Sequence, residues 1–104
     1  MQADSRTVLR LLVRNHPGVL SHVSGLFARR GFNVEGVLCV PVDDGRCSAV
    51  LLLLADDGRL TQLAAQLRKL EDVLDIHPDP DARLAFDAVA RHVAPDVAGV
   101  RRTG

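Results

Sequence analysis

The amino-acid sequence predicts an α+β fold, in which a four-stranded antiparallel sheet carries two helices on one face and is followed by a C-terminal tail helix. Apolar residues alternate over 8–13, as in a strand with one buried face. They recur at helical spacing over 17–30 and 58–70. An Asp-Asp-Gly turn separates two more strand-like stretches, 32–42 and 46–55. These patterns indicate a strand, a helix, a hairpin of two strands and a second helix.

The first half of the chain contains the clearest start and stop signals. In the strand over 8–13, Leu9, Leu11 and Val13 should face one side of the sheet. The helix is expected from about Pro17 to Arg30, where Gly31 supplies a left-handed cap. Its core-facing stripe consists of Val19, Val23, Leu26 and Phe27.

The hairpin prediction also fixes a strand register. If Asp44-Gly45 forms a two-residue loop, Val42 pairs with Cys47. Cys39 then lies on the opposite face of the sheet from Cys47, so the two cysteines could not form a disulfide. A three-residue loop would alter this pairing.

In the second half, Asp57 is the expected N-cap of a helix of about Gly58 to Leu70, and a short strand follows over 73–77. The segment 78–81 contains two prolines and should end regular structure. A short helix over 84–93, with Phe86 and Val89 on one face, precedes an end expected to fray over 97–104. The order β-α-β-β-α-β is the ferredoxin-like arrangement. We assign residues 1–80 to this domain (core about 7–78) and 81–104 to the tail.

Composition excludes several functional classes. Lys plus Arg equals Asp plus Glu at 13 each, so no net charge attracts nucleic acid or an anionic membrane. Aromatic residues make up 3%, which disfavours stacking on RNA bases. The apolar run over 49–55 is too short to span a bilayer, and the N-terminal residues do not resemble a signal peptide. We therefore expect a cytoplasmic protein of one small domain.

The third strand predicts an oligomer. Cys47, Ala49, Leu51 and Leu53 share one face, while Val50, Leu52 and Leu54 share the other, so both faces are apolar. Two helices can cover only one face of the sheet. Because large apolar patches are rarely left in water, the other face is expected to contact another subunit.

A candidate binding site lies at the Asn15-His16-Pro17-Gly18 turn. Pro17 suits the first helical position, and Gly18 allows close approach to the backbone. The N–H groups of Gly18, Val19 and Leu20 would then favour a small anion at the helix start. The alternative is an ordinary strand-to-helix turn. Asn33 is either a second turn residue or an amide beside a bound polar group.

Catalytic and metal sites are not indicated. His16 and His22 do not share a helical face, no Cys or carboxylate completes a ligand set, and there is no CxxC pair. Ser21 and His22 point to different sides of the helix, unlike a nucleophile and its base. Glu71 and Asp72 are expected in a solvated loop.

The stretch NHPGVLSHVSGLFARRGFNVEGV (residues 15–37), with the predicted element order, resembles the ACT domain. It is most similar to the regulatory small subunits of acetohydroxyacid synthase (acetolactate synthase), in the short form associated with isozyme I. The resemblance covers roughly Val8 to Val93 and includes LEDVLDI at 70–76. Other members carry a second C-terminal domain, which this chain is expected to lack.

This resemblance implies a non-catalytic subunit in branched-chain amino acid biosynthesis. Valine would bind between the ACT domains of a homodimer and confer feedback inhibition, and the small subunit would also activate its partner, the catalytic large subunit. Thiamine diphosphate, magnesium and FAD would belong to that partner, and this chain would hold no cofactor or metal. The tail helix would either dock on the partner or pack back onto its own domain.

The resemblance also implies the residues of the effector site. Backbone N–H groups of one subunit would meet the carboxylate of valine beside the Asn15 amide, and residues of the second subunit would complete the site. The implied set is Asn15, Gly18, Val19, Leu20, Asn33 and Val34.

Two alternative functions remain at this stage. One is an ACT-type sensor for another amino acid or another enzyme. The other is an acylphosphatase-like small enzyme, which would need an arginine cradled in the loop after the first strand. Here the nearest arginine, Arg14, precedes that loop.

Overall fold

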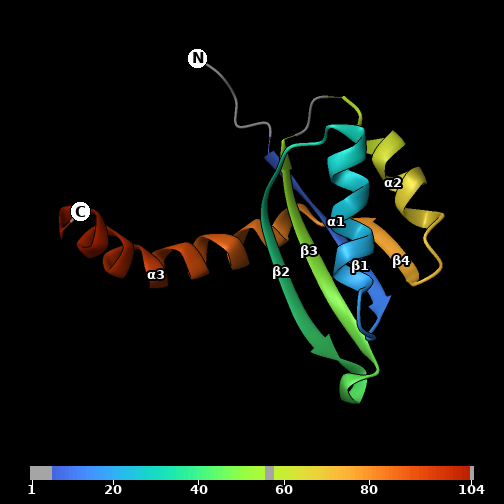
Figure 1. Cartoon of the computed structure of the whole chain (residues 1–104), viewed down its shortest axis with the longest axis horizontal. Coiled ribbons are helices and arrows are strands. Elements are labelled where there is room, and N and C mark those ends of the chain that lie inside the picture. Colours follow the sequence, from blue (N-terminus) through green and yellow to red (C-terminus); the bar gives the residue numbers. More distant parts are fainter. Residues whose placement is uncertain (1–5, 56–57, 104) are drawn as a thin grey trace.

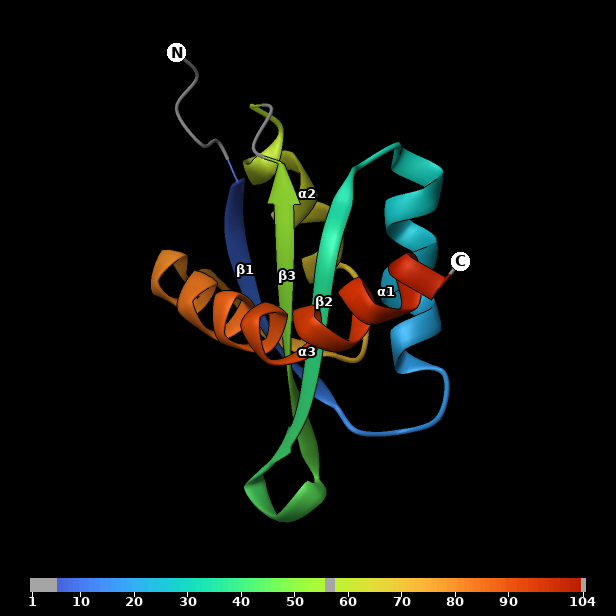
Figure 2. The ribbon, with the colours of Figure 1, turned by 90° about the vertical axis from the view of Figure 1, so that its left-hand side faces the viewer.

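The computed structural model describes residues 6–55 and 58–103, with side chains as far as Pro95. Four strands form one antiparallel sheet: β1 (Arg6–Arg14), β2 (Val34–Val42), β3 (Cys47–Ala55) and β4 (Val73–Pro78), in the order β2-β3-β1-β4. Helices α1 (Val19–Arg30) and α2 (Leu60–Arg68) cover one face of the sheet (Figure 1). Helix α3 (Arg83–Thr103) lies on the other side, in front of the strands in Figure 2. The predicted fold class and order of elements along the chain are confirmed.

The core lies between the sheet and helices α1 and α2. Its strand residues are the ones that alternation predicts, and the α1 stripe is buried as expected. Burying one such aliphatic side chain stabilises the fold by about 1.5–3 kcal/mol. The buried cluster consists of Leu9, Leu11, Val13, Val19, Val23, Leu26, Phe27, Val50, Leu52, Leu54, Leu63, Leu67 and Ile76.

The hairpin prediction is confirmed in register. Val42 pairs with Cys47, and the N–H of Arg46 donates to the carbonyl of Asp43 across 3.1 Å. Asp43 (φ 53°), Asp44 (φ 56°) and Gly45 (φ 84°) are all left-handed and Arg46 is helical, so four residues connect the strands and not the two-residue loop from which the register was predicted. Cys39 pairs with Val50 on the helix-covered face, opposite the face of Cys47, and both cysteines are free.

Several predicted boundaries are wrong for local reasons. Helix α1 begins at Val19 and not at Pro17, because Gly18 is left-handed (φ 87°) and interrupts helical geometry. Strand β2 begins at Val34, since Phe32 turns inward beneath Arg59, whose guanidinium lies 4.4 Å from the ring centroid. Helix α2 covers only Leu60–Arg68, and the proposed cap Asp57 lies outside the described residues.

The C-terminal segment differs most from the sequence prediction. Pro78 is part of β4, an edge strand where a missing N–H is tolerated. Pro80 opens a 3₁₀ turn (Pro80–Ala82) that leads directly into α3, so 78–81 does not end regular structure. The tail is a 21-residue helix, longer than 84–93, and its backbone stays helical to Thr103 where fraying was expected. Its many alanines, which have the highest helix propensity, favour this length.

The face of the sheet opposite α1 and α2, called the open face below, is only partly covered. Val8 and Leu53 are buried on it, near the base of α3. Ala49 and Leu51 are half-buried, and Val40 is 53% exposed. The expectation of an uncovered apolar face is therefore correct over β2 and β3, away from the base of α3.

Candidate functional site

The turn between β1 and α1 is attached to the β2–β3 hairpin. The side-chain amide of Asn15 donates to the carbonyl of Gly45 across 2.8 Å, and its backbone N–H donates to the carbonyl of Arg46 across 3.1 Å. One donor of the Asn15 amide is thus committed, and an amide has a second N–H and an oxygen that can still form hydrogen bonds at this exposed residue. These bonds hold Asn15 in a fixed position beside the helix start.

The start of α1 offers two N–H groups to a ligand. Within residues 6–55 and 58–103, no hydrogen bond engages the N–H of Gly18 or Leu20. The N–H of Val19, predicted to be free, instead donates to the carbonyl of His16 across 3.3 Å. A Cβ added at Gly18 would have no atom within 4 Å, so the turn is open to solvent beside this residue. An anion could approach both N–H groups here.

Asn33 and Val34 lie at the opposite end of α1. The 12 residues of this helix span about 18 Å at ~1.5 Å per residue. Asn33 is exposed, and its carbonyl accepts a hydrogen bond from the N–H of Ala55 across 3.4 Å. A single chain therefore brings Asn15, Gly18, Val19 and Leu20 together, and it leaves Asn33 and Val34 apart from them.

Asp72 is a member of this region that sequence reasoning missed. Its Oδ2 lies 2.6 Å from Nε2 of His16 and 3.8 Å from Nδ1 of His22, and its side chain is only 16% exposed. The expectation that Asp72 is simply solvated is wrong, although among the described residues these side chains do not form a group that could hold a metal ion. Because the loop before β4 folds against the start of α1, residues 50 positions apart become neighbours. No spacing within the sequence reports such a contact.

Both ring nitrogens of His16 lie beside hydrogen-bond acceptors, which favours its charged form. Its Nδ1 lies 2.7 Å from the carbonyl of Pro17, while Nε2 contacts Asp72. Both partners accept, and only the imidazolium has two N–H groups to donate. The pKa of His16 is raised above 6.5, and the hydrogen bond to the Pro17 carbonyl is the largest cause and the hydrogen bond to Asp72 the second.

The raised pKa predicts a pH-dependent contribution to folding. His16 should stabilise the fold fully below pH 6.5, its value in the unfolded chain, and this contribution should be lost as pH rises through the raised pKa. NMR titration of the four histidines should show His16 titrating above 6.5 and moving down in Asp72→Asn. Denaturation should lose the corresponding pH dependence in His16→Gln and keep it in His92→Gln, an exposed control on α3. An unshifted His16 would contradict the prediction.

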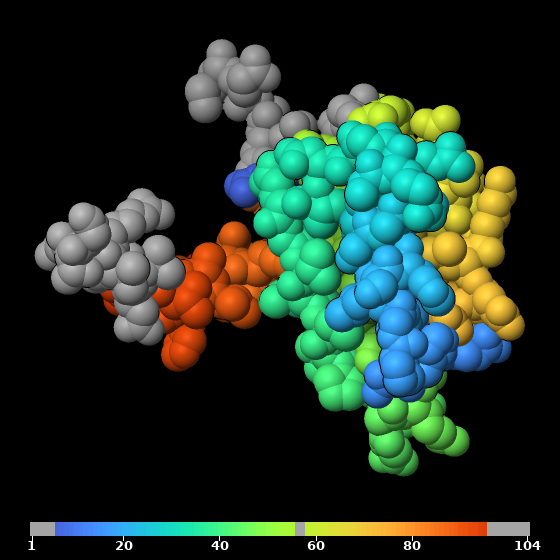
Figure 3. All heavy atoms as spheres, viewed as in Figure 1, coloured from blue at the N-terminus to red at the C-terminus, as the bar shows by residue number. Residues whose placement is uncertain are grey.

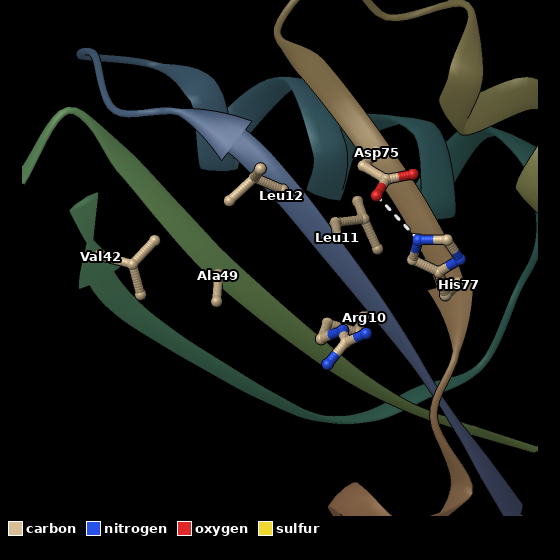
Figure 4. Close-up of a pocket in the computed structure, with 7 residues that line it drawn as sticks. All are labelled: Arg10, Leu11, Leu12, Val42, Ala49, Asp75 and His77. Carbon is tan, nitrogen blue, oxygen red and sulfur yellow. Dashed lines mark hydrogen bonds and ion pairs between the residues drawn. The ribbon is translucent and has the colours of Figure 1, made fainter.

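Two cavities lie near these elements. One, of about 340 Å³, opens between α1 and the loop before β4, with an apolar floor that includes Val19 and Val23 and a rim that includes Lys69 and Asp72. The other, of about 300 Å³, lies on the open face between Arg10 and Leu12 of β1, Ala49 of β3 and the β4 pair Asp75–His77 (Figure 4). There, His77 Nε2 lies 2.7 Å from Asp75, and this hydrogen bond lowers the pKa of Asp75.

The geometry offers little to a catalyst. Among the described residues, no group of three His, Cys, Asp or Glu side chains could hold a metal ion. Arg14 donates to the carbonyl of Glu71 across 2.9 Å, so the arginine that an acylphosphatase-like enzyme would need is not cradled in the loop. In the same part of the chain, none of the helices has the length and apolar character needed to cross a membrane.

Comparison with known proteins gives one consistent answer. Residues 9–75 match the family model described as the AHAS small subunit-like ACT domain. The chain is 51% identical to the acetolactate synthase isozyme 1 small subunit of Escherichia coli K12, over 80% of this chain and 86% of that protein. It is 40% identical to the isozyme 3 small subunit of the same organism, over 68% of this chain and 44% of that protein.

Solved structures agree. The acetolactate synthase small subunit of Thermotoga maritima aligns with a TM-score of 0.66 and 32% identity, covering 72% of this chain and 48% of that one. The ACT domain of the GTP pyrophosphokinase of Chlorobium tepidum aligns with a TM-score of 0.58 at 19% identity, which shows the shared fold alone. By sequence and by fold, this chain belongs to the family of acetolactate synthase small subunits that contain an ACT domain.

Proposed function

We propose that the chain is the regulatory subunit of an acetolactate synthase and that it binds valine between two of its copies. The observation that carries this proposal is the division of the predicted effector site. Asn15, Gly18 and Leu20 present an amide and two unengaged N–H groups at one end of α1, and Asn33 and Val34 lie about 18 Å away at its other end. A second copy is needed to complete the site.

Edge strand β2 supplies a route to this assembly. It has nine residues at the edge of the sheet, and Val37 and Val40 on it are 47% and 53% exposed. Long apolar edges readily pair with another chain. Antiparallel pairing of two β2 strands would set Val34 of the second copy beside Val42 of the first. That is the end at which Asn15 is bonded to Gly45.

The ligand chemistry follows from the two half-sites. The carboxylate of an amino acid would accept from the N–H groups of Gly18 and Leu20, near the positive end of the α1 dipole. The polar end of the amino acid would form hydrogen bonds with the Asn15 amide and with Asn33 of the second copy. The half-exposed Leu20 and the half-buried Val34 would contact a branched aliphatic side chain. The choice of valine rests on the family.

Regulation would then act by linkage. Valine stabilises one arrangement of the dimer, and that arrangement binds the catalytic subunit differently, with a coupling of about 1–3 kcal/mol as is typical of allosteric pairs. Feedback inhibition of branched-chain amino acid biosynthesis follows from this coupling, and activation of the catalytic subunit follows from its association with this chain. The small subunit is non-catalytic, and thiamine diphosphate, magnesium and FAD are held by the catalytic subunit. Its free cysteines are typical of the reducing cytoplasm.

Calorimetry tests this proposal. Valine titrated into the full chain should release heat, and unrelated amino acids should release none; stronger binding of leucine or isoleucine would reassign the effector. Asn15→Ala and Asn33→Ala should each weaken binding about 10-fold or more, since each loses a hydrogen bond to a charged group worth about 1.5–3 kcal/mol. Absence of heat with any branched-chain amino acid would refute the valine site, as would unchanged binding in both folded variants.

Helix α3 is the proposed contact with the catalytic subunit. It stands away from the rest of the molecule (Figure 3), and Val89 and Val93, one turn apart on the same side, are 45% and 43% exposed. An apolar stripe left outside the core is typical of a helix that docks on a partner. Because these residues do not pack back onto the domain, docking is the better supported of the two roles.

A further inference from the structure

Phe86 of helix α3 contacts strand β2 closely. A Cβ added to Gly36 of β2 would lie 2.9 Å from Cε1 and 3.1 Å from Cδ1 of Phe86. Such a close approach requires a residue without a side chain. Phe86 is half-buried at this contact, whereas Val89, one turn further along, is exposed. Phe86 is therefore a point of contact between α3 and β2, and Figure 2 shows the helix passing in front of the sheet.

The base of α3 is fixed independently. The N–H of Asp79 donates to the carbonyl of Val8 across 2.8 Å, and the Asp79 carboxylate lies 3.4 Å from the guanidinium of Arg10. The N–H of Ala82 donates in turn to the carbonyl of Asp79 across 3.0 Å. The segment that leads into α3 is thus attached to β1, and the contact of Phe86 with Gly36 is a further attachment within the helix.

Gly36 follows an irregularity in β2. The β2–β3 register shifts between Val34, which pairs with Leu54, and Gly36, which pairs with Leu53. Glu35 is the extra residue of this bulge, and its carboxylate lies 3.4 Å from Arg6 in an exposed ion pair. Bulges locally bend and twist a strand, so small changes on one side re-aim the residues on the other. Here one side is the proposed effector residue Val34, and the other is the contact of Phe86.

We propose that Gly36 and Phe86 relay effector binding at Asn33 and Val34 to the direction of α3. This relay rests on the proposed function. A ligand that orders Asn33 and Val34 shifts the bulge, which moves Gly36 beneath the ring and tilts the helix about its attachment at Asp79. Because α3 extends about 25 Å beyond Phe86 at ~1.5 Å per residue, a small rotation at its base displaces its far end substantially.

The composition of the chain provides a clean test. It contains three phenylalanines and neither Trp nor Tyr, so incorporation of 4-fluorophenylalanine gives three ¹⁹F signals. Phe32 precedes Asn33 and reports ligand binding, Phe86 reports the relay, and Phe27 in the core reports the fold. In the full chain, valine should shift the Phe32 and Phe86 signals with the same saturation curve and should leave Phe27 in place.

Gly36→Ala is the decisive variant. Its Cβ would collide with Phe86 but would make only an ordinary 3.5 Å contact with Leu53, so the ring is what must move. The Phe86 signal should be displaced before valine is added and should respond no further, while valine affinity stays within about twofold and inhibition of the reconstituted synthase is lost. Gly25→Ala is the control, because its Cβ would approach only the flexible Arg29 side chain and should leave every response as in the wild type.

The outcomes separate the two proposals. If valine releases no heat and Phe32 does not shift, the proposed function fails and the relay fails with it. If valine binds and Phe32 shifts while Phe86 stays in place, the relay alone is overturned. It is equally overturned if Gly36→Ala responds to valine as the wild type does.

Discussion

Gly18→Ala should weaken valine binding about 10- to 150-fold, since hydrogen bonds to charged groups contribute about 1.5–3 kcal/mol each. The new Cβ would have no protein atom within 4 Å, so it would project into open space at the turn where we propose that the carboxylate binds. The substitution would also strain the backbone, because Gly18 has φ 87°. Calorimetry with valine measures the loss, and chemical denaturation measures the strain, expected to be about 1–2 kcal/mol.

Gly58→Ala is the matched control for this strain. Gly58 has φ 91°, and a Cβ there would also have no atom within 4 Å. It precedes α2, away from the Asn15 turn, so the variant should lose similar stability and keep its affinity for valine. If the two variants lose the same amount of affinity, the effect of Gly18→Ala is merely one of stability, and the turn is not the binding site.

Val89→Asp and Val93→Asp should each weaken association with the catalytic subunit by tenfold or more. Burying a valine contributes about 1.5–3 kcal/mol, and burying an unpaired carboxylate in its place adds a further penalty. Both positions are exposed in the isolated chain, so folding and valine binding should be unchanged. Titration of the purified catalytic subunit with each variant measures the association constant.

Ala88→Asp separates the apolar stripe from helix charge. Ala88 is exposed and lies off the stripe, about 100° around α3 from Val89 and about 140° from Val93, so the same carboxylate is introduced where no contact is proposed. This variant should associate normally. Equal losses in all three variants would indicate that charge, and not the Val89–Val93 stripe, governs docking. No loss in any of them would place the contact elsewhere in the chain.

Most of the fold could be predicted because local chemistry and tertiary packing agree in it. The alternation of Leu9, Leu11 and Val13 and the Asp-Gly turn specify strand face and hairpin register directly. The element boundaries could not be predicted so well. Gly18 adopts a left-handed conformation, so Pro17 is not part of helix α1. Phe32 packs beneath Arg59 and is therefore not part of strand β2. Tertiary context decides both.

The candidate site was predictable where it is local in sequence. In the stretch from Asn15 to Leu20, the turn residues, the glycine and the start of the helix are adjacent in the sequence, so their combined capacity to bind an anion can be inferred from the sequence. Asp72 was missed because its contact with His16 depends on how the loop before β4 returns to α1. The contact between Phe86 and Gly36 was not predicted, because no residue near Gly36 in the sequence indicates that a helix 50 residues further along the chain packs against it.

The separation of Asn15 and Asn33 at opposite ends of α1 has a consequence for sensitivity in the cell. If each complete site requires two copies, valine binding and self-association obey one mass-action equilibrium. Dilution of the subunit then lowers its apparent affinity for valine, and valine in turn tightens the dimer by the same factor. The abundance of this chain, and not the chemistry of its pocket alone, would set the valine concentration at which the pathway responds.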